Sequence, residues 1–128
     1  MNAWRSPKKF WLWFDPRAKH PGTLGYIMNR VAGIGLTLYL FMHLLALGQL
    51  ALGPGAYDRF IALAHNPLFI AGEYLVVAAG LLHGLNGLRI VYTSLGKGAA
   101  YQKPLFYALM SLALVAILYF GFRMFGGG

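Results

Sequence analysis

Cysteine is absent from this chain of 128 residues, and acidic side chains are scarce. Without a thiolate, the chain itself forms no disulfide and holds no iron–sulfur cluster through sulfur, and its composition says nothing about redox compartment. Only 3 aspartates and glutamates stand against 11 lysines and arginines. Internal repeats are missing too, and low-complexity sequence is limited to a glycine tail, residues 126–128. The whole chain is 59% hydrophobic, which is not the composition of an ordinary soluble domain.

Three long apolar runs fill most of the chain. They extend from about Met28 to Leu52, from Leu68 to Tyr92 and from Pro104 to Phe125. Each exceeds the roughly 20 residues that cross about 30 Å of hydrocarbon. We therefore expect an all-α membrane protein with three transmembrane helices, in which residues 27–125 form a single three-span domain.

Positive charge is concentrated on two segments and indicates the orientation. Residues 1–26 hold five of the cations, and Lys97 and Lys103 lie between the second and third spans. The positive-inside rule places both segments on the cytoplasmic side, with the N-terminus inside. The net charge of +8 is then mainly a topology signal. We expect a multi-pass protein of the cell inner (cytoplasmic) membrane, in contact with lipid and without a nucleic-acid partner.

The two remaining segments flank the first span. In residues 1–26 the cations are mixed with tryptophan and phenylalanine, which suits the lipid headgroup layer, and Pro21-Gly22 predicts a helix break. We expect an interfacial segment there, with a surface that contacts a soluble partner as the alternative. Residues 53–67 are rich in turn formers and predict an outside connector in which His65 is solvated.

A titratable ring, His83, lies inside the otherwise almost uncharged second span. Burying it in lipid is costly, which favours a function. At roughly 100° per residue, Gly80, Asn86 and Gly87 fall within about 60° of His83. A nitrogen ligand beside a trough without side chains suits a flat, bulky cofactor, so we predict that His83 is an axial ligand of a haem b. Helix packing through the glycines is the alternative.

A second intramembrane histidine, His43, lies at a different depth. It follows Arg30 by 13 residues, or about 20 Å of helix, whereas His83 precedes Arg89 by six, or about 9 Å. If both arginines mark the cytoplasmic boundary, the rings differ in depth by about 10 Å. Two haems, each completed by a ligand from another polypeptide or another copy, fit this better than one shared haem. Two structural histidines are a further alternative.

Arg30 and Glu73 are two of the charged side chains within the spans. Arg30 lies just inside the apolar boundary, where it either snorkels to the interface or contacts a haem propionate or a quinone carbonyl. Glu73 is the one acid in a span, and snorkelling or a hydrogen bond to a neighbouring helix is favoured over proton transfer.

Two short motifs lie at the cytoplasmic ends of the first two spans. The run Asn-Arg-Val-Ala-Gly-Ile covers Asn29 to Ile34, and the run His-Gly-Leu-Asn-Gly-Leu-Arg covers His83 to Arg89. They resemble the His-Arg-x-(Ser/Thr)-Gly-(Ile/Val) and His-x-x-x-Gly-Ile-Arg motifs of the SdhC-like cytochrome b membrane anchor of succinate dehydrogenase and fumarate reductase. The likeness covers about residues 24–125 and includes three spans with the N-terminus inside.

The resemblance implies a diheme anchor subunit of succinate:quinone oxidoreductase, complex II, which links the tricarboxylic acid cycle to electron transport. Its partners would be a second membrane-anchor subunit, an iron–sulfur subunit and a flavoprotein, and this chain would have no site for succinate. His83 would ligate the inner haem and His43 the outer one. Arg30 and Arg89 would contact propionates, and quinone would bind near Arg30 and Tyr26.

The chain also departs from the family pattern. Asn29 stands where the family has His, Tyr26 where many members have Ser, and Ile90 where His often follows the arginine. These differences affect the quinone and propionate contacts and leave the two iron ligands in place. Two other functions remain open: a cytochrome b subunit of another quinone-linked dehydrogenase, and a haem-free structural or transport subunit.

Overall fold

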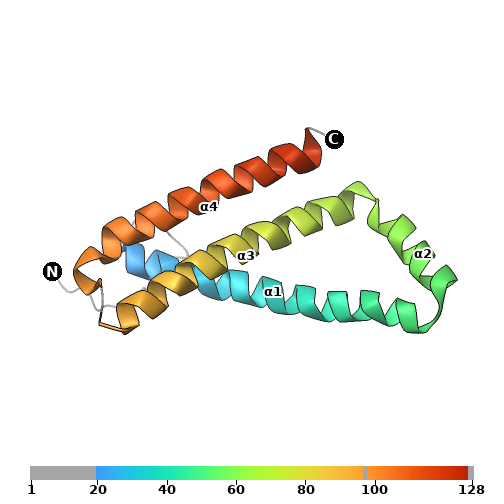
Figure 1. Cartoon of the computed structure of the whole chain (residues 1–128), viewed down its shortest axis with the longest axis horizontal. Helices are drawn as coiled ribbons and strands as arrows, with labels where there is room; N and C mark the ends of the chain where they lie inside the picture. The colour runs from blue at the N-terminus through green and yellow to red at the C-terminus, as the bar shows by residue number, and fades with distance from the viewer. Residues whose placement is uncertain (1–19, 97, 127–128) are drawn as a thin grey trace, which may run out of the picture.

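The computed structural model describes residues 20–96 and 98–126, and these form three long helices with short connections (Figure 1). The long helices are α1 (Pro21–Ala51), α3 (Pro67–Ser94) and α4 (Gln102–Phe125), and the short turn η3 (Ala99–Tyr101) precedes α4. All three are long and apolar enough to cross a membrane, which confirms the predicted fold class. The expectations for residues 1–19, Lys97 and residues 127–128 lie outside the described part.

The first helix starts earlier than the apolar run suggests. Pro21-Gly22, predicted to break a helix, begins α1 instead. Proline is well suited to the first helical position, because its missing N–H has no helical partner there in any case. The backbone N–H groups of Thr23 and Leu24 donate to the carbonyl of His20 at 2.9 and 3.1 Å. At 31 residues α1 is about 46 Å long, so it extends beyond the hydrocarbon layer.

The connector between the first two spans contains a helix that its turn formers did not predict. α2 (Pro54–Ala64) follows Gly53, whose φ of 104° favours glycine, and Pro54 occupies the start of the helix. Figure 1 shows α2 bridging the ends of α1 and α3. The ring of His65 is exposed, as predicted, but its Nδ1 also lies 2.8 Å from the carbonyl oxygen of Ile61 in the last turn of α2.

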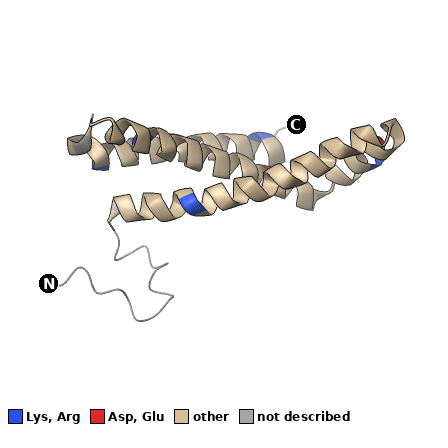
Figure 2. Cartoon of the chain, turned by 90° about the horizontal axis from the view of Figure 1, so that it is seen from below, with Lys and Arg blue, Asp and Glu red and all other residues tan. Residues whose placement is uncertain are grey.

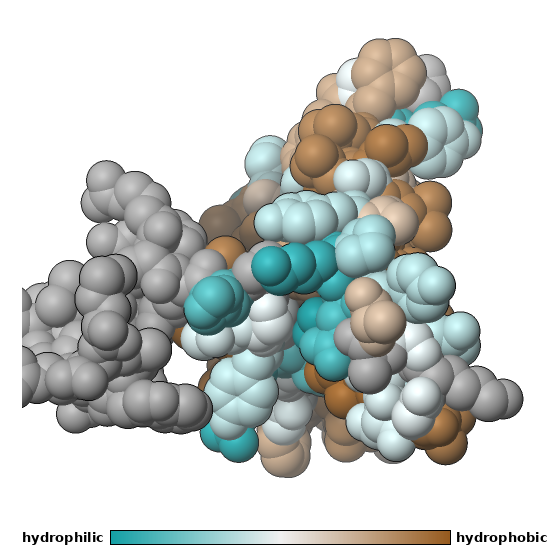
Figure 3. All heavy atoms as spheres, turned by 90° about the vertical axis from the view of Figure 1, so that its left-hand side faces the viewer, coloured by the Kyte–Doolittle hydropathy of each residue, from teal (hydrophilic) through white to brown (hydrophobic). Residues whose placement is uncertain are grey.

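The bundle has two ends with different character. At the N-terminal end, α1 and α4 begin and α3 ends; at the other, the α2 end, α2 joins α1 to α3 (Figure 1). Hydrophilic side chains gather on the face of the N-terminal end (Figure 3). Elsewhere the helices carry few charges (Figure 2), as expected for a surface in contact with lipid or with other membrane subunits.

Few side chains are buried between the helices. The buried apolar residues in the described part are Ala32, Phe106 and Ala113, and the buried polar ones are Asn86 and Arg89. Large apolar side chains point outward along every span, with Leu45 71% exposed as an example. Lipid tails are as apolar as leucine, so packing of small residues and interhelical hydrogen bonds hold such helices together.

One of these interhelical bonds lies toward the α2 end. The hydroxyl of Tyr74 in α3 donates to the carbonyl of Ile117 in α4 at 3.1 Å. The Tyr74 ring packs against Gly121, where an added Cβ would lie 3.0 Å from the hydroxyl oxygen, and meets the Phe125 ring edge to face at 5.6 Å. The contact fixes α4 against the first half of α3.

The substitution Tyr74→Phe should weaken this contact. Losing the hydroxyl leaves the carbonyl of Ile117 without its additional donor, and we expect a loss of about 0.5–1.5 kcal/mol of unfolding free energy. Tyr119→Phe is the matched control, because Tyr119 is 60% exposed on α4. Unfolding in mild detergent, followed by tryptic cleavage, measures both variants; equal stability would contradict the assigned role.

Candidate functional site

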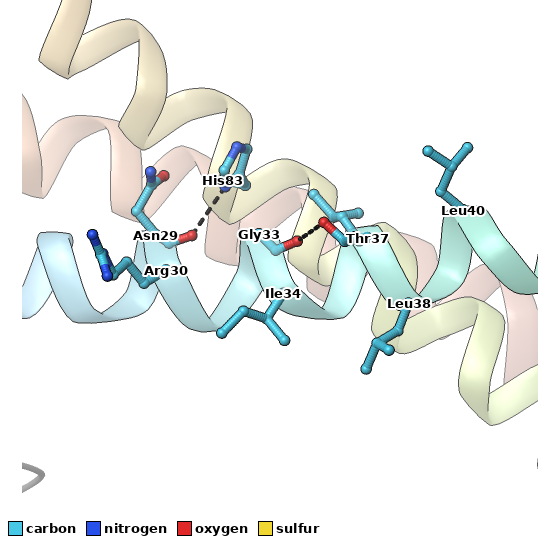
Figure 4. Close-up of a pocket in the computed structure, with 9 residues that line it drawn as sticks. Asn29, Arg30, Gly33, Ile34, Thr37, Leu38, Leu40 and His83 are labelled. Carbon is cyan, nitrogen blue, oxygen red and sulfur yellow. Dashed lines mark hydrogen bonds between the residues drawn. The ribbon is translucent and has the colours of Figure 1, made fainter.

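His83 is held by α3 against the first turns of α1. Its Nδ1 lies 3.0 Å from the carbonyl oxygen of Asn29 (Figure 4). A carbonyl only accepts hydrogen bonds, so Nδ1 carries the proton and donates it. In the neutral form of the ring, this tautomer leaves a free lone pair on Nε2. This is the protonation pattern of a histidine that binds a metal through Nε2, so the donor fits an axial position on a haem iron.

Gly33 allows the ring of His83 to approach α1 closely. A Cβ added at Gly33 would lie 3.2 Å from Cε1 and 3.4 Å from Nδ1 of His83, inside or at the edge of ordinary contact distance. Gly33 lies one helical turn after Asn29, so both contacts arise from the same turn. In the sequence Gly33 is only one member of a motif, and its contact with His83 is visible only once α1 and α3 are paired.

A groove of about 690 Å³ runs along this part of α1 and includes His83. Arg30 lines it, and its guanidinium carbon lies 5.1 Å from the centre of the Tyr26 ring, close enough for a cation–π contact. Both side chains are exposed. The two residues predicted to bind quinone therefore lie together, one turn apart, next to the turn that holds His83.

The glycines near His83 on α3 do not pack against another part of the described chain. A Cβ added at Gly80, Gly84 or Gly87 would have no heavy atom within 4 Å. They lie at about 40–100° from His83 around the helix, all to the same side. Packing against residues 20–96 and 98–126 of this chain therefore does not account for these glycines, and helix packing could explain them only through another neighbour. The strip is bare beside His83, as a flat cofactor or a close-packed neighbour requires.

Asn86 lies on the other side of His83 and faces α1. Its side chain is fully buried, and Nδ2 donates to the carbonyl of Gly25 at 2.9 Å. Arg89, 7% exposed, also approaches Gly25, and its guanidinium carbon lies 5.2 Å from the centre of the Phe106 ring. Neither residue lines the groove of His83. Sequence spacing grouped Asn86 with Gly80 and Gly87, whereas the structure places it inside the bundle.

Two atoms of this interior cluster have no hydrogen-bond partner among the described residues. They are Oδ1 of Asn86 and Nε of Arg89. Outside the cluster, Oδ1 of Asn29 is also buried without a hydrogen-bond partner among the described residues. Buried polar atoms without partners are costly, which favours a water or another bound group beside them. An added Cβ at Gly25 would lie 3.0 Å from Oδ1 of Asn86 and 2.9 Å from Nη2 of Arg89, so only glycine leaves the space that both side chains occupy.

His43 faces a separate cavity toward the α2 end. The cavity has a volume of about 480 Å³ and is lined by residues of α1, α2 and α3 that include Phe60, Ile61, Phe69 and Glu73. The ring of His43 is exposed and tilted against Tyr39 at 5.6 Å, with the Tyr39 hydroxyl 3.5 Å from Nδ1. The side chain of Glu73 is exposed beside the same cavity.

The two histidines lie at different levels of the bundle. His83 contacts Asn29 and Gly33, and His43 follows Gly33 by ten residues, which is a rise of about 15 Å. Both nitrogens of a bis-imidazole haem must reach one iron, so a haem shared by these two rings of one chain does not fit. No cluster of three or more potential metal ligands occurs in residues 20–96 and 98–126. A porphyrin needs only an axial ligand from the chain.

Comparison with known proteins extends this picture. Residues 5–120 match the family model described as "Succinate dehydrogenase/Fumarate reductase transmembrane subunit". The chain is 29% identical over 99 residues to "Succinate dehydrogenase 2 membrane subunit SdhC" of Mycobacterium tuberculosis, covering 77% of this chain and 73% of that protein. It is 28% identical over 98 residues to "Succinate dehydrogenase hydrophobic membrane anchor subunit" of Halobacterium salinarum, covering 76% and 75%.

The interior cluster predicts the effect of a single methyl group. Gly25→Ala should push Asn86 and Arg89 away from α1 and cost about 1–3 kcal/mol of unfolding free energy, despite the better helix propensity of alanine. Gly22→Ala, where a Cβ would meet nothing within 4 Å, should be neutral or stabilising. Chemical unfolding in detergent micelles, followed by circular dichroism, compares the two. Equal stability of the variants would contradict the close approach at Gly25.

Proposed function

Because this chain belongs to the family of succinate dehydrogenase/fumarate reductase transmembrane subunits, we propose that it anchors a succinate:quinone oxidoreductase and binds two b-type haems. The observation that carries the proposal is the hydrogen bond from Nδ1 of His83 to the carbonyl of Asn29, which leaves Nε2 free for iron. The membrane location follows from the three apolar helices and from the related membrane subunits.

The inner haem is assigned to His83. The bare strip of Gly80, Gly84 and Gly87 beside the ring gives a flat group access to the face of α3. Arg30 is exposed and lines the groove that includes His83, and it offers a cation to a propionate. Arg89, the other arginine predicted to contact a propionate, is buried between the helices and does not line this groove. A bound haem would supply reversible one-electron chemistry at this level of the membrane.

The outer haem is assigned to His43. Its exposed ring borders the 480 Å³ cavity beneath α2, and the level differs from that of His83 by several helical turns. This chain offers one axial imidazole at each level. The second ligand of each iron comes from a partner membrane subunit or from another copy of this chain, so each haem would be shared.

Quinone is the proposed substrate of the membrane part of the complex, bound beside Arg30 and Tyr26. The guanidinium can donate several hydrogen bonds to a quinone carbonyl, and its charge stabilises the negative charge that develops on that oxygen during reduction. The phenol of Tyr26 is 55% exposed next to Arg30, so it can donate from the same side. The proposed quinone site therefore lies at the N-terminal end of the bundle, next to the turn of α1 that contacts His83, the proposed ligand of the inner haem.

The proposed partners are a second membrane-anchor subunit, an iron–sulfur subunit and a flavoprotein that oxidises succinate. The N-terminal end of the bundle, with its hydrophilic face, is proposed to lie on the cytoplasmic side of the cell inner membrane, where the soluble subunits dock (Figure 3). The long exposed apolar faces of the spans are available to lipid and to the second anchor subunit.

Spectra of the purified complex test the ligand assignments. His83→Ala should remove the signal of the inner haem and His43→Ala that of the outer haem from the reduced-minus-oxidised difference spectrum, each leaving the other partly retained. His65→Ala is the control, because its ring bonds the backbone of α2 and should leave both signals. Full haem content in either test variant would refute that ligand, and the absence of a b-type signal in the unaltered complex would favour the haem-free alternative.

Quinone kinetics test the site at Arg30. Arg30→Leu should lower kcat/KM for quinone about 10-fold or more, the usual effect of losing a charged hydrogen-bond donor, while haem content changes little. Arg123→Leu removes a cation from the last turn of α4 and serves as the control. Succinate oxidation by an artificial electron acceptor should stay normal in both variants and shows that the soluble subunits are intact. Unchanged quinone kinetics in Arg30→Leu would contradict the proposed site.

A further inference from the structure

One turn of α1 holds the imidazole of His83 in two ways. The carbonyl oxygen of Asn29 lies 3.0 Å from Nδ1, and the missing Cβ of Gly33 leaves room for Cε1. Residues four apart in a helix lie one above the other, so the acceptor and the bare backbone form one continuous surface. Figure 4 shows the ring of His83 above both residues.

We infer that Asn29 to Gly33 form a positioning turn, which fixes the tautomer and the place of the His83 ring and presents Nε2 to iron. This inference rests on the proposed function and adds to it. Gly33 is the positioning residue, since it acts through His83 and not by contact with iron. The hydrogen bond to the carbonyl increases the basicity of Nε2, and so it strengthens the bond to an oxidised iron.

The contact uses the main chain, and this has a consequence for the identity of residue 29. A carbonyl inside a helix keeps its direction whatever side chain the residue carries. Asn29 therefore supplies the same carbonyl acceptor that a histidine would supply at this position of the family motif. Gly33 is different, because any side chain there would press on the ring at 3.2 Å. The positioning turn thus requires glycine at position 33, whereas position 29 tolerates other side chains.

The neighbouring turn supports the same piece of backbone. The Thr37 hydroxyl donates to the Gly33 carbonyl at 2.9 Å, which ties the two turns together. On the opposite helix, Asn86 is bonded to the carbonyl of Gly25 one turn before Asn29. The bond from Thr37 lies within α1 and supports its backbone, and the bond from Asn86 crosses from α3 and holds α1 in place beside the positioning turn.

The substitution Gly33→Ala in the purified complex tests this inference. The added methyl should move the ring and lengthen its bond to the carbonyl, so the inner haem should bind about 10- to 100-fold more weakly. The inner haem that remains should have a higher midpoint potential, because a less basic imidazole stabilises oxidised iron less. Gly48→Ala is the matched control on the same helix, where a Cβ would meet nothing within 4 Å.

A second measurement needs neither haem nor a variant of Gly33. The full chain labelled with ¹⁵N-histidine, reconstituted in lipid vesicles without haem, gives imidazole ¹⁵N shifts that distinguish the two neutral tautomers. Comparison with His83→Ala identifies the signal of His83. We expect the tautomer protonated at Nδ1, and a ring protonated at Nε2 would overturn the inference.

The outcomes separate this inference from the proposed function. Loss of the inner haem in His83→Ala, together with a higher potential in Gly33→Ala and no shift in Gly48→Ala, supports both. If His83→Ala removes the haem but Gly33→Ala behaves as Gly48→Ala does, the positioning turn is overturned and the ligand assignment stands. If His83→Ala leaves the inner haem in place, the proposed function fails at that ligand, and the inference fails with it.

Discussion

The bilayer offers no water to satisfy a polar side chain, and this constraint decides how α1 and α3 pair. Asn86 and His83 lie three residues apart on α3, and they bond the carbonyls of Gly25 and Asn29, four residues apart on α1. The two bonds form a short ladder between antiparallel helices. A helix slipped by one turn would place Asn86 and His83 against residues of α1 that carry side chains, in place of Gly25 and Gly33, so the two bonds together with the two glycines fix the register.

The ladder also explains why the two ends of the bundle differ. It requires the helices to lie close together, and Gly25 and Gly33 provide the necessary space. α1 is longer than α3, and the helices separate toward the α2 end, where the amphipathic α2 covers the space between them (Figure 1). The separated end holds the cavity beside His43. A tight polar contact at one level thus goes together with an open apolar cavity at the other.

Hydropathy and motif spacing predict the spans, the different levels of His43 and His83, and the family, because each depends on residues that are near in sequence. They did not predict α2, since Gly53 and Pro54 are turn formers that here start a helix. The helical wheel correctly placed Asn86 near His83 around α3, but it contains no information on which neighbour each side faces. The role of Gly33 depends on the pairing of two helices and therefore appears only in the structure.

The architecture of the chain argues for assembly with another membrane subunit. The bundle buries few apolar side chains in its described part, so its helices gain little from packing on one another. The glycine strip next to His83 and the exposed ring of His43 both lie on surfaces that the described residues leave uncovered. A group held at each level by one imidazole from each of two subunits would bridge them, and the bond to iron would then add to the packing that holds the anchor together. On this view the scarcity of internal packing and the single histidine at each level have one cause: the bundle is completed by a second membrane subunit.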